Sequence, residues 1–390
     1  MKPRTRLAIA HSFYRLPGGE DQYVRSQIDL MRHHHDVQVI ERCNEDLNAG
    51  LGTTARMTWS SRLVGELEQE LDGFQPHVVH VHNVYPALGP AVHMAARRLT
   101  IPLVMTVHNQ RLRCPNGLMF TEGSPCRRCE RGLYTNAIRH DCFQTRTQAA
   151  AYATSLWLHR FILRLEEQVA LFIAPSVFMR DRLLEWGIAE HRVAMIRNFT
   201  PLPNDASSEP GRYGIYLGRL SIEKGLPELL RALREAGDPP FWFVGDGPSE
   251  VALRRLAGQL ELDRTQFLGR VDYPEIPGIV RGARYLVLPS LCDENAPLAA
   301  LEAMAEGRPL LVTRAGGLPE LVQEGAGLIC DRGSVADMAA QIRRMASDDD
   351  LCRRAGASAL SFARRELLPS MHRQRLEGAY ARAVAYRFQG

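Results

Sequence analysis

The chain has 390 residues, enough for two domains of ordinary size that each bury their own apolar core. Hydrophobic residues make up 45% of the chain and charged residues 24%, as in folded globular proteins. The formal net charge at pH 7 is only +4, which gives no reason to expect a nucleic-acid partner. Eight cysteines in a chain of this length do not indicate a disulfide framework.

The first apolar run, Leu7–Ala10, is too short for a secretory signal and predicts a strand instead. No run approaches the roughly eighteen apolar residues that a membrane-spanning helix needs. We therefore expect a soluble or peripheral protein, located in the cytoplasm or on the inner face of the membrane.

Strand and helix patterns alternate in the first half of the chain. Short apolar runs predict strands at Leu7–Ala10, Val37–Ile40, Val78–Val81 and Leu103–Val107. Apolar residues at helical spacing predict helices at Tyr23–Met31 and Arg62–Leu71. Such alternation is typical of an α/β domain in which helices cover both faces of a mostly parallel sheet.

A second α/β domain follows a linker rich in proline, serine and acidic residues. We place an N-terminal α/β domain at 1–200, the linker at 201–212, a C-terminal α/β domain at 213–368, and a helix at 369–390 that crosses back to the first domain. Further strands are predicted at Gly214–Leu217, Phe241–Val244, Phe267–Leu268, Tyr285–Leu288, Leu310–Val312 and Gly327–Ile329. Two doubly wound domains facing across a cleft would place binding loops at the C-terminal ends of their strands.

Lys224 and Lys2 are the only lysines, and every other positively charged side chain is an arginine apart from the histidines. Lys224 and Arg219 lie between a strand with a glycine turn and a helix whose first turn holds Pro227. Free amides and the helix dipole favour an anion at such a helix N-terminus. The alternative is that both residues are solvated surface cations.

Two glutamates follow the strand Tyr285–Leu288. Glu294 lies in a polar loop, and Glu302 lies in a helix that Pro297 opens, with seven residues between the two glutamates. Both carboxylates could accept hydrogen bonds from hydroxyls of a bound sugar or ribose. Taken alone, glutamates at this spacing are more often solvated charges on a helix face.

The order of these motifs resembles the nucleotide-binding half of the retaining family-4 glycosyltransferases of GT-B fold, over residues 213–330. The strand-to-glycine turns FVGDGP, FLGRV and TRAGGLPELV and the Glu-x7-Glu spacing carry the resemblance. It implies that Arg219 and Lys224 hold the donor diphosphate, that Glu302 binds the ribose and that Glu294 contacts the transferred sugar.

The resemblance also implies that main-chain groups near Arg270 and Val271 meet the nucleotide base. This chain has Asn295-Ala296-Pro297-Leu298 where the family often has glycine-rich sequence. Pro297 has no amide hydrogen to donate, so Asn295, Ala296 and Leu298 are left as the donor contacts.

The N-terminal half resembles the same family more loosely. Gly18 and Gly19, in RLPGGEDQYV, resemble the glycine-rich loop that lets the backbone approach the donor phosphate and the acceptor. His108 follows the strand Leu103–Val107, where relatives carry a histidine beside the transferred sugar. His80 and His82 are equally well explained as core or as site residues.

Four cysteines cluster in an insertion at about 110–145, with the spacing C-x11-C-x2-C-x12-C. They are Cys114, Cys126, Cys129 and Cys142. A structural zinc ion would fit four thiolates in a cytosolic loop that lacks periodicity. Free thiols or a labile disulfide are the alternatives.

Residues 97–164 contain eleven arginines and only three acidic residues. The segment Tyr152–Leu165 adds Trp157, Phe161 and Ile162 at helical spacing. Such a surface could lie on an anionic membrane and meet a lipid-linked acceptor. A packed helix whose arginines reach water explains the pattern equally well.

Together these features predict a hexosyltransferase-like enzyme that moves a sugar from a nucleotide diphosphate sugar to a hydroxyl of a glycan or lipid-linked acceptor. The cations would stabilise the leaving diphosphate, so no catalytic metal or cofactor is expected. The resemblance implies attack from the same face as the leaving group, with retention and with the departing phosphate as base.

A nucleotide-sugar epimerase, a phosphorylase and a non-catalytic sugar-nucleotide sensor are the alternatives. A dinucleotide dehydrogenase is the weakest, because no G-x-G-x-x-G follows the first strand.

Overall fold

The computed structural model describes residues 4–14, 18–43 and 57–386. The chain divides into two compact units. Unit 1 comprises Met1–Glu122, Cys126–Ile196 and His372–Gly390, and unit 2 comprises Gly123–Pro125 and Arg197–Met371. Residues 201–212, which we expected to form a linker, therefore lie inside unit 2.

Buried Arg308 explains why this segment belongs to unit 2. Its side chain is 1% exposed, and its guanidinium donates hydrogen bonds to the carbonyl oxygens of Ser207, Glu209 and Ala283. A buried cation requires such acceptors, because an unsatisfied one is costly. The proline- and serine-rich segment is thus fixed by backbone contacts despite its linker-like composition.

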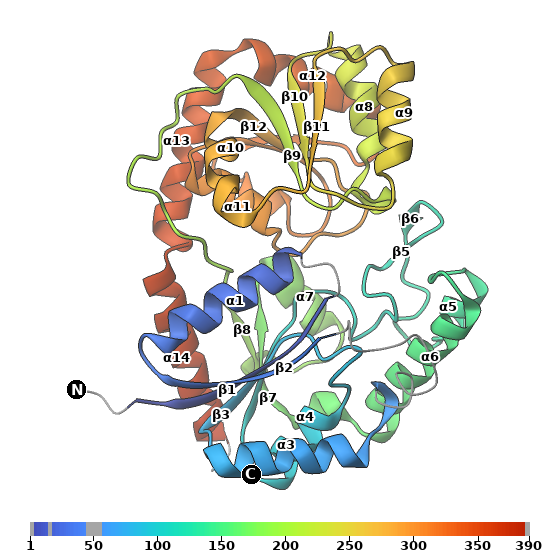
Figure 1. Cartoon of the computed structure of the whole chain (residues 1–390), viewed down its shortest axis with the longest axis vertical. Coiled ribbons are helices and arrows are strands. Elements are labelled where there is room, and N and C mark those ends of the chain that lie inside the picture. The colour runs from blue at the N-terminus through green and yellow to red at the C-terminus, as the bar shows by residue number, and fades with distance from the viewer. Residues whose placement is uncertain (1–3, 15–17, 44–56, 387–390) are drawn as a thin grey trace. The chain divides into compact units, whose positions relative to one another are not determined.

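Unit 1 contains a six-stranded parallel sheet in the order β2-β1-β3-β4-β7-β8 (Figure 1). Its strands are β1 (Arg6–Phe13), β2 (Asp36–Cys43), β3 (Val78–Val81), β4 (Leu103–Thr106), β7 (Val169–Ala174) and β8 (Val193–Met195). The four strands predicted in this half are confirmed, and β7 and β8 are additional. The sheet order reverses between β1 and β3, where the loops after these strands diverge.

Helices cover both faces of this sheet. The helices of unit 1 are α1 (Gly19–Arg32), α3 (Ser61–Phe74), α4 (Ala91–Arg98), α5 (Asn136–Arg139), α6 (Arg146–Trp157), α7 (Val177–Glu185) and α14 (Pro369–Tyr386). One apolar cluster joins the sheet to α3, α4 and α7, and another joins the opposite side chains of the strands to α14. The strands are therefore apolar on both faces, which explains their continuous apolar runs.

The C-terminal helix α14 begins in unit 2, and from His372 onward its residues belong to unit 1. Leu376 and Tyr380 are buried in the apolar cluster of unit 1. Tyr380 also hydrogen-bonds His80 at 2.8 Å, and His372 hydrogen-bonds Tyr23 at 3.0 Å. Residues 387–390 of the predicted helix lie outside the described residues.

Unit 2 contains a second six-stranded parallel sheet, in the order β11-β10-β9-β12-β13-β14. Its strands are β9 (Tyr213–Leu217), β10 (Phe241–Val244), β11 (Thr265–Gly269), β12 (Ala283–Leu288), β13 (Leu310–Thr313) and β14 (Gly327–Cys330). All six were predicted, and the order 3-2-1-4-5-6 is that of a Rossmann fold. The loops that follow β9 and β12 diverge at the switch point, where such folds bind ligands.

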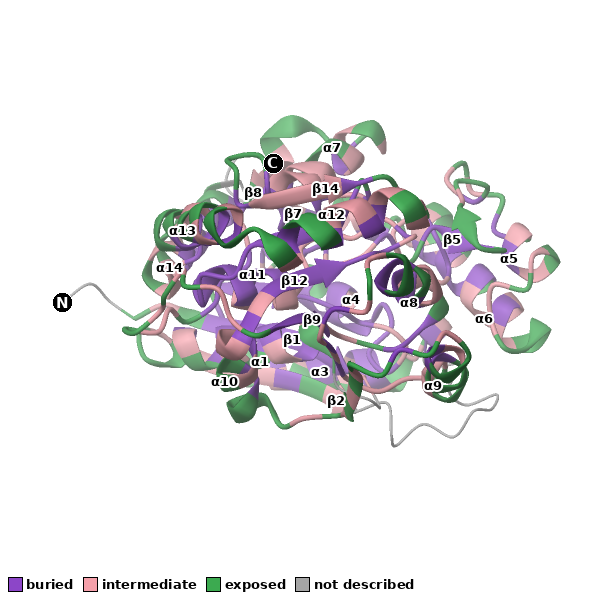
Figure 2. Ribbon diagram, turned by 90° about the horizontal axis from the view of Figure 1, so that it is seen from above, coloured by how far each residue is buried: buried purple, intermediate pink, exposed green. Residues whose placement is uncertain are grey.

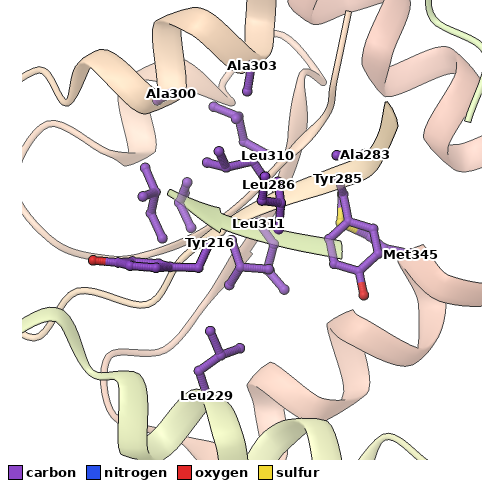
Figure 3. Close-up of a cluster of buried hydrophobic side chains, with 14 of the residues drawn as sticks. Tyr216, Leu229, Ala283, Tyr285, Leu286, Ala300, Ala303, Leu310, Leu311 and Met345 are labelled. Atoms are coloured by element: carbon purple, nitrogen blue, oxygen red, sulfur yellow. The ribbon is translucent and has the colours of Figure 1, made fainter. Parts of the chain in front are cut away.

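Figure 1 shows α8, α9 and α12 on one side of this sheet and α10, α11 and α13 on the other. The helices are α8 (Leu226–Glu235), α9 (Glu250–Gln259), α10 (Ile276–Gly282), α11 (Leu298–Ala305), α12 (Val335–Ser347) and α13 (Asp349–Glu366). The core between them includes Tyr216, Leu229, Tyr285 and Leu311 (Figure 3). Figure 2 shows the strands largely buried and the outer faces of many helices exposed.

Candidate functional site

Lys224 and Glu294 meet at the switch point of unit 2. Lys224 Nζ donates to Glu294 Oε1 at 2.5 Å, and Ser290 Oγ donates to the same oxygen at 2.6 Å. The side chains are 24% and 13% exposed, so the pair is neither free in water nor fully enclosed. Glu294 Oε2 makes no hydrogen bond with the described residues.

The turn that carries Lys224 lies directly against the loop that follows β12. Gly225 has a φ of +67°, and a Cβ atom on it would lie 2.1 Å from the carbonyl oxygen of Pro289. The carbonyl of Glu223 accepts hydrogen bonds from the amides of Leu291 and Cys292, at 2.8 and 3.2 Å. Only glycine fits this left-handed position and close approach, which explains the residue after Lys224.

The loop that carries Glu294 is held on its other side by β13 and its following turn. The buried hydroxyl of Thr313 donates to the carbonyl of Ser290 at 2.7 Å, and the amide of Gly317 donates to the carbonyl of Glu294 at 2.7 Å. Arg332 pairs with Asp293 at 2.6 Å. The Glu294 carboxylate is therefore held in place by its backbone as well as by Lys224.

Burial would lower the pKa of Lys224, but the charge and hydrogen bond of Glu294, together with neighbouring Cys292 and Tyr216, raise the pKa above its ordinary value. Lys224 therefore stays a cation throughout the neutral range. Burial raises the pKa of nearby Cys292 to about 12, and the Glu294 charge adds to that shift. The Cys292 thiol is consequently protonated and is a poor nucleophile.

Arg219 lies in the loop that follows β9 and is exposed. Its backbone carbonyl accepts a hydrogen bond from the buried Tyr216 hydroxyl at 2.7 Å, whereas its guanidinium makes no hydrogen bond or ion pair with the described residues. The structure thus places Lys224 against Glu294, whereas the Arg219 guanidinium has no hydrogen-bond partner among the described residues. Arg270 and Val271 follow the neighbouring strand β11, where Arg270 is exposed and Val271 half-buried.

Glu302 lies on α11, the helix that directly follows the loop carrying Glu294. Burial raises its pKa from 4.5 to about 7, and a hydrogen bond with Tyr273 acts in the opposite direction. Near neutral pH this carboxyl group is therefore divided between its two protonation states. Such a group can donate to or accept from a ligand hydroxyl.

The residues between the two glutamates form the entry to α11. Asn295, Ala296 and Leu298 are half-buried, and the carbonyl of Ala296 accepts a hydrogen bond from Asn198 at 3.4 Å. No side chain caps the helix at Pro297, and the amide of Leu298 has no partner among the described residues. A free amide at a helix N-terminus suits an anion.

His108 lies beside a group of histidines at the C-terminal ends of β3 and β4 in unit 1. His82 Nδ1 and His108 Nε2 are hydrogen-bonded at 2.9 Å, and their rings stack with centroids 5.2 Å apart. Burial lowers the pKa of His108 to about 3, and that of His80 to about 3. These histidines are therefore neutral at physiological pH. His82 Nε2 is buried without a partner, which favours a site residue over a satisfied core residue.

Gly18 and Gly19 lie at the start of α1, while Arg15, Leu16 and Pro17 of the same glycine-rich loop lie outside the described residues. The Gly18 amide donates to Asp21 Oδ2 at 3.3 Å. A Cβ on Gly18 would meet nothing within 4 Å. The described residues thus leave open space at the Cβ position of Gly18.

The sequence interpretation missed Asp21, which pairs with His11. His11 Nε2 and Asp21 Oδ1 lie 2.8 Å apart, and both side chains are at most 1% exposed. The backbone amide of Asn83 donates to His11 Nδ1 at 3.3 Å. Nδ1 is therefore an acceptor, and the imidazole proton is on Nε2. This pair fixes the start of α1 against the end of β1. Its signal in the sequence was an acidic residue in the first helical turn after Gly18-Gly19.

Glu20 and Arg111 were also missed as site residues. Both line the cavity of unit 1 that His82 and His108 line. The sequence placed Arg111 only among the basic residues of 97–164. Its distinguishing signal is its position three residues after His108.

The four clustered cysteines line one small cavity together with His140. Each of them is a free thiol, and burial raises the pKa of Cys129 to about 12. Over the described ranges, no three histidine, cysteine or acidic side chains converge closely enough to hold a metal ion. The side chains as placed do not form a zinc site, so the structural zinc stays a prediction, which metal analysis of the purified chain would test.

The basic segment 97–164 is less cationic at its surface than its composition indicates. Arg113 is buried and pairs with Glu166, while Arg127 and Arg128 pair with glutamates at the surface. The apolar residues are more informative. Trp157, Phe161 and Ile162 are 47%, 45% and 56% exposed. Among the helices that the structure describes, none has the length and apolar character to span a bilayer.

Two family profiles match the chain in succession. The profile described as Glycosyltransferase Family 4 matches residues 17–202, and the one described as Glycosyl transferases group 1 matches residues 203–361. Together the two profiles cover residues 17–361, and the chain belongs to the glycosyltransferases that they describe. The dividing point between the two matches lies close to the boundary between the two units.

The relatives of this glycosyltransferase have diverse names. The chain is 30% identical over 305 residues to a glycogen synthase of Mycobacterium tuberculosis, and the match covers 73% of this chain and 64% of the relative. It is 27% identical over 264 residues to a 2-deoxystreptamine glucosyltransferase of Streptomyces kanamyceticus, covering 65% and 64%. The chain spans less than two thirds of the length of the curated relatives it matches.

Solved structures show the same GT-B fold. Sucrose-phosphate synthase from Thermosynechococcus elongatus superposes with a TM-score of 0.69 at 18% identity, over 98% of this chain and 100% of that chain. Anabaena HepE, solved with UDP and glucose, gives a TM-score of 0.68 at 19% identity, over 97% and 100%. The predicted fold class of two doubly wound α/β domains is confirmed.

Proposed function

We propose that this glycosyltransferase moves a hexose from a UDP-sugar to a hydroxyl of a glycan or lipid-linked acceptor, with retention at the anomeric carbon. The observation that carries the proposal is the contact between Lys224 and Glu294 at the switch point of unit 2. UDP as the nucleotide rests on the similarity to HepE, which was solved with UDP and with UDP-glucose.

Lys224 supplies the charge that the leaving diphosphate needs. One of its three N–H groups is donated to Glu294, which leaves two for phosphate oxygens. The free amide of Leu298 at the start of α11 and the uncommitted guanidinium of Arg219 add donors of the same kind. These groups can stabilise a departing diphosphate without a divalent metal.

The two glutamates bind the remainder of the donor. Glu294 Oε2, which has no hydrogen bond among the described residues, accepts from a hydroxyl of the transferred sugar. Glu302 accepts from the ribose hydroxyls, with Arg270 and Val271 near the base. Because Lys224 and Ser290 both bind Glu294 Oε1, the carboxylate is oriented before the donor arrives.

In the reaction the bond between the anomeric carbon and the phosphate oxygen breaks, and a bond to the acceptor oxygen forms on the same face. The acceptor proton passes to the departing phosphate, so no side-chain nucleophile is needed. Neutral His108 contributes a hydrogen bond to the sugar rather than a charge, because burial holds its pKa at about 3.

The exposed apolar side chains of unit 1 support a peripheral contact with an anionic membrane. Trp157 and Phe161 have ring centroids 6.2 Å apart, and the Phe161 ring rests on Gly132, beside Leu133, which is 63% exposed. Arg131 and Arg97 are exposed in the same segment, and the side chain of neither is paired with a described residue. Aromatic and basic side chains together are typical of membrane-surface sites.

Thermal unfolding of the full chain with UDP-, GDP- and ADP-sugars tests the donor. A ligand that binds only the folded state raises the melting temperature, and we expect this for UDP-sugars. Product analysis with UDP-glucose then separates transfer, which needs an acceptor, from epimerisation, which does not. An absence of stabilisation by every nucleotide sugar would contradict the proposed function.

A further inference from the structure

We propose that the cavity of unit 1 lined by Glu20, His108 and Arg111 binds an acceptor that carries both a hydroxyl and an oxyanion, either phosphate or carboxylate, and that Arg111 binds the oxyanion. This inference rests on the proposed function and adds the chemical class of the acceptor.

The guanidinium of Arg111 makes no hydrogen bond or ion pair with the described residues, although the Glu20 carboxylate attracts it electrostatically. Its guanidinium carbon lies 5.4 Å from the ring centroid of Tyr85 and 5.5 Å from that of Tyr152. Its Nε is buried and makes no hydrogen bond, and no carboxylate forms an ion pair with it among the described residues. Because a buried unpaired donor is costly, a site kept in this state is expected to receive an acceptor from a ligand.

The other cations that line the cavity are already engaged. Arg160 donates to the carbonyl of Glu130 at 2.9 Å and to the Tyr134 hydroxyl at 3.0 Å. The lining histidines include His82, His93 and His159, and burial lowers the pKa of each, so they are neutral at pH 7. Arg111 is therefore the cation that the described lining offers to an anion.

Glu20 offers the complementary group. Tyr14 and Asn109 both donate to its Oε2, at 3.2 and 3.4 Å, whereas its Oε1 is buried without a partner. A free carboxyl oxygen accepts from a hydroxyl and disfavours a second anion beside it. An acceptor with a hydroxyl at Glu20 and an oxyanion at Arg111 would satisfy both unpartnered atoms.

His82 and His108 line the same cavity, where His82 Nε2 and His93 Nδ1 are also buried without a partner among the described residues. His108 is also the residue proposed to contact the transferred sugar. The cavity thus places the acceptor's binding groups next to the residue that meets the reacting sugar.

Calorimetric titration of the full chain with three small probes tests the inference: glucose, glucose 6-phosphate and glucuronate. We expect wild type to bind at least one anionic probe roughly tenfold or more tightly than glucose, because a charge-assisted hydrogen bond is lost with the neutral probe. Which anionic probe binds more tightly identifies phosphate or carboxylate. Arg111→Met should reduce the affinity for the anion to that for glucose, and Arg111→Lys should retain part of the preference.

Arg25→Met is the matched control, because Arg25 is exposed, lies over the Phe13 ring at 4.2 Å and does not line this cavity. UDP titration of the same variants reports the proposed function separately and should be unchanged. Equal affinity of wild type for glucose and both anions, or an anion preference that survives in Arg111→Met, would overturn the inference. If wild type did not bind UDP, the proposed function would be overturned instead.

Discussion

Lys224 and Glu294 lie 70 residues apart in the chain and on different loops of unit 2, yet Lys224 Nζ lies 2.5 Å from Glu294 Oε1. The pair joins the turn after β9 to the loop after β12. It thereby connects the two loops at the switch point, where the strand order of the parallel sheet reverses and where such sheets bind ligands.

Removal of either partner should destabilise unit 2, because the remaining charge stays largely buried. We expect Lys224→Met and Glu294→Gln each to lower the free energy of unfolding by roughly 1–3 kcal/mol, less than for a fully enclosed pair. The double variant should lose less free energy of unfolding than the two single variants lose in sum. Urea unfolding of all four proteins measures this difference. Arg234 and Glu261, an exposed pair in the same unit, serve as the control cycle with little coupling. Strict additivity for Lys224 and Glu294 would show that the contact is not energetically significant.

The sequence predicted the strands of unit 2 well because they are short apolar runs, and four of them, β9 to β12, end at or just before a glycine or a proline. It could not predict that Lys224 binds Glu294, since strand order is a tertiary property and the contact depends on β9 lying beside β12. It also treated 201–212 as a linker, because composition does not reveal that buried Arg308 binds the carbonyls of Ser207 and Glu209. Arg111 was missed because its partners, Tyr85 and Tyr152, are distant in sequence.

Glu302 should make stability depend on pH. Its folded-state pKa of about 7 lies above the ordinary value of 4.5, so the folded state binds the proton more tightly than the unfolded state. Stability from this group is therefore present below about pH 4.5 and is lost as the pH rises towards 7. Glu302→Gln should raise the free energy of unfolding at pH 8 by up to roughly 3 kcal/mol and have little effect at pH 4.5.

Chemical unfolding at both pH values measures this effect. Glu235→Gln is the control, because that glutamate is exposed on α8. If Glu302→Gln and wild type keep the same difference in stability at both pH values, the pKa of Glu302 is not raised.

Gly225 should be essential for the position of Lys224. In Gly225→Ala the new Cβ would lie 2.1 Å from the Pro289 carbonyl oxygen, so the turn must move and UDP affinity should fall. Gly237→Ala is the matched control, because Gly237 also has a positive φ, +90°, but a Cβ there meets nothing within 4 Å. The control should lose roughly 1 kcal/mol of stability from backbone strain and keep its UDP affinity. An equal effect of both variants on UDP affinity would exclude a specific role for this close approach.

The exposed aromatic surface of unit 1 should bind anionic membranes. We expect Trp157→Ser combined with Phe161→Ser to reduce cosedimentation with phosphatidylserine-containing vesicles several-fold, because apolar burial and aromatic anchoring are lost. Val251→Ser, at a residue 73% exposed in unit 2, is the control. Binding of wild type that is no stronger to anionic than to neutral vesicles, or that the double variant retains, would argue against the membrane contact.

The most direct test of the central claim, that Lys224 binds the donor diphosphate, compares UDP with uridine by calorimetric titration. The account predicts that Lys224→Met weakens UDP binding roughly 10- to 100-fold while uridine binding is unchanged, because only UDP carries the phosphates. Arg234→Met, on the helix that follows Lys224, should leave both affinities as in wild type. Equal UDP affinity in wild type and Lys224→Met would contradict the account.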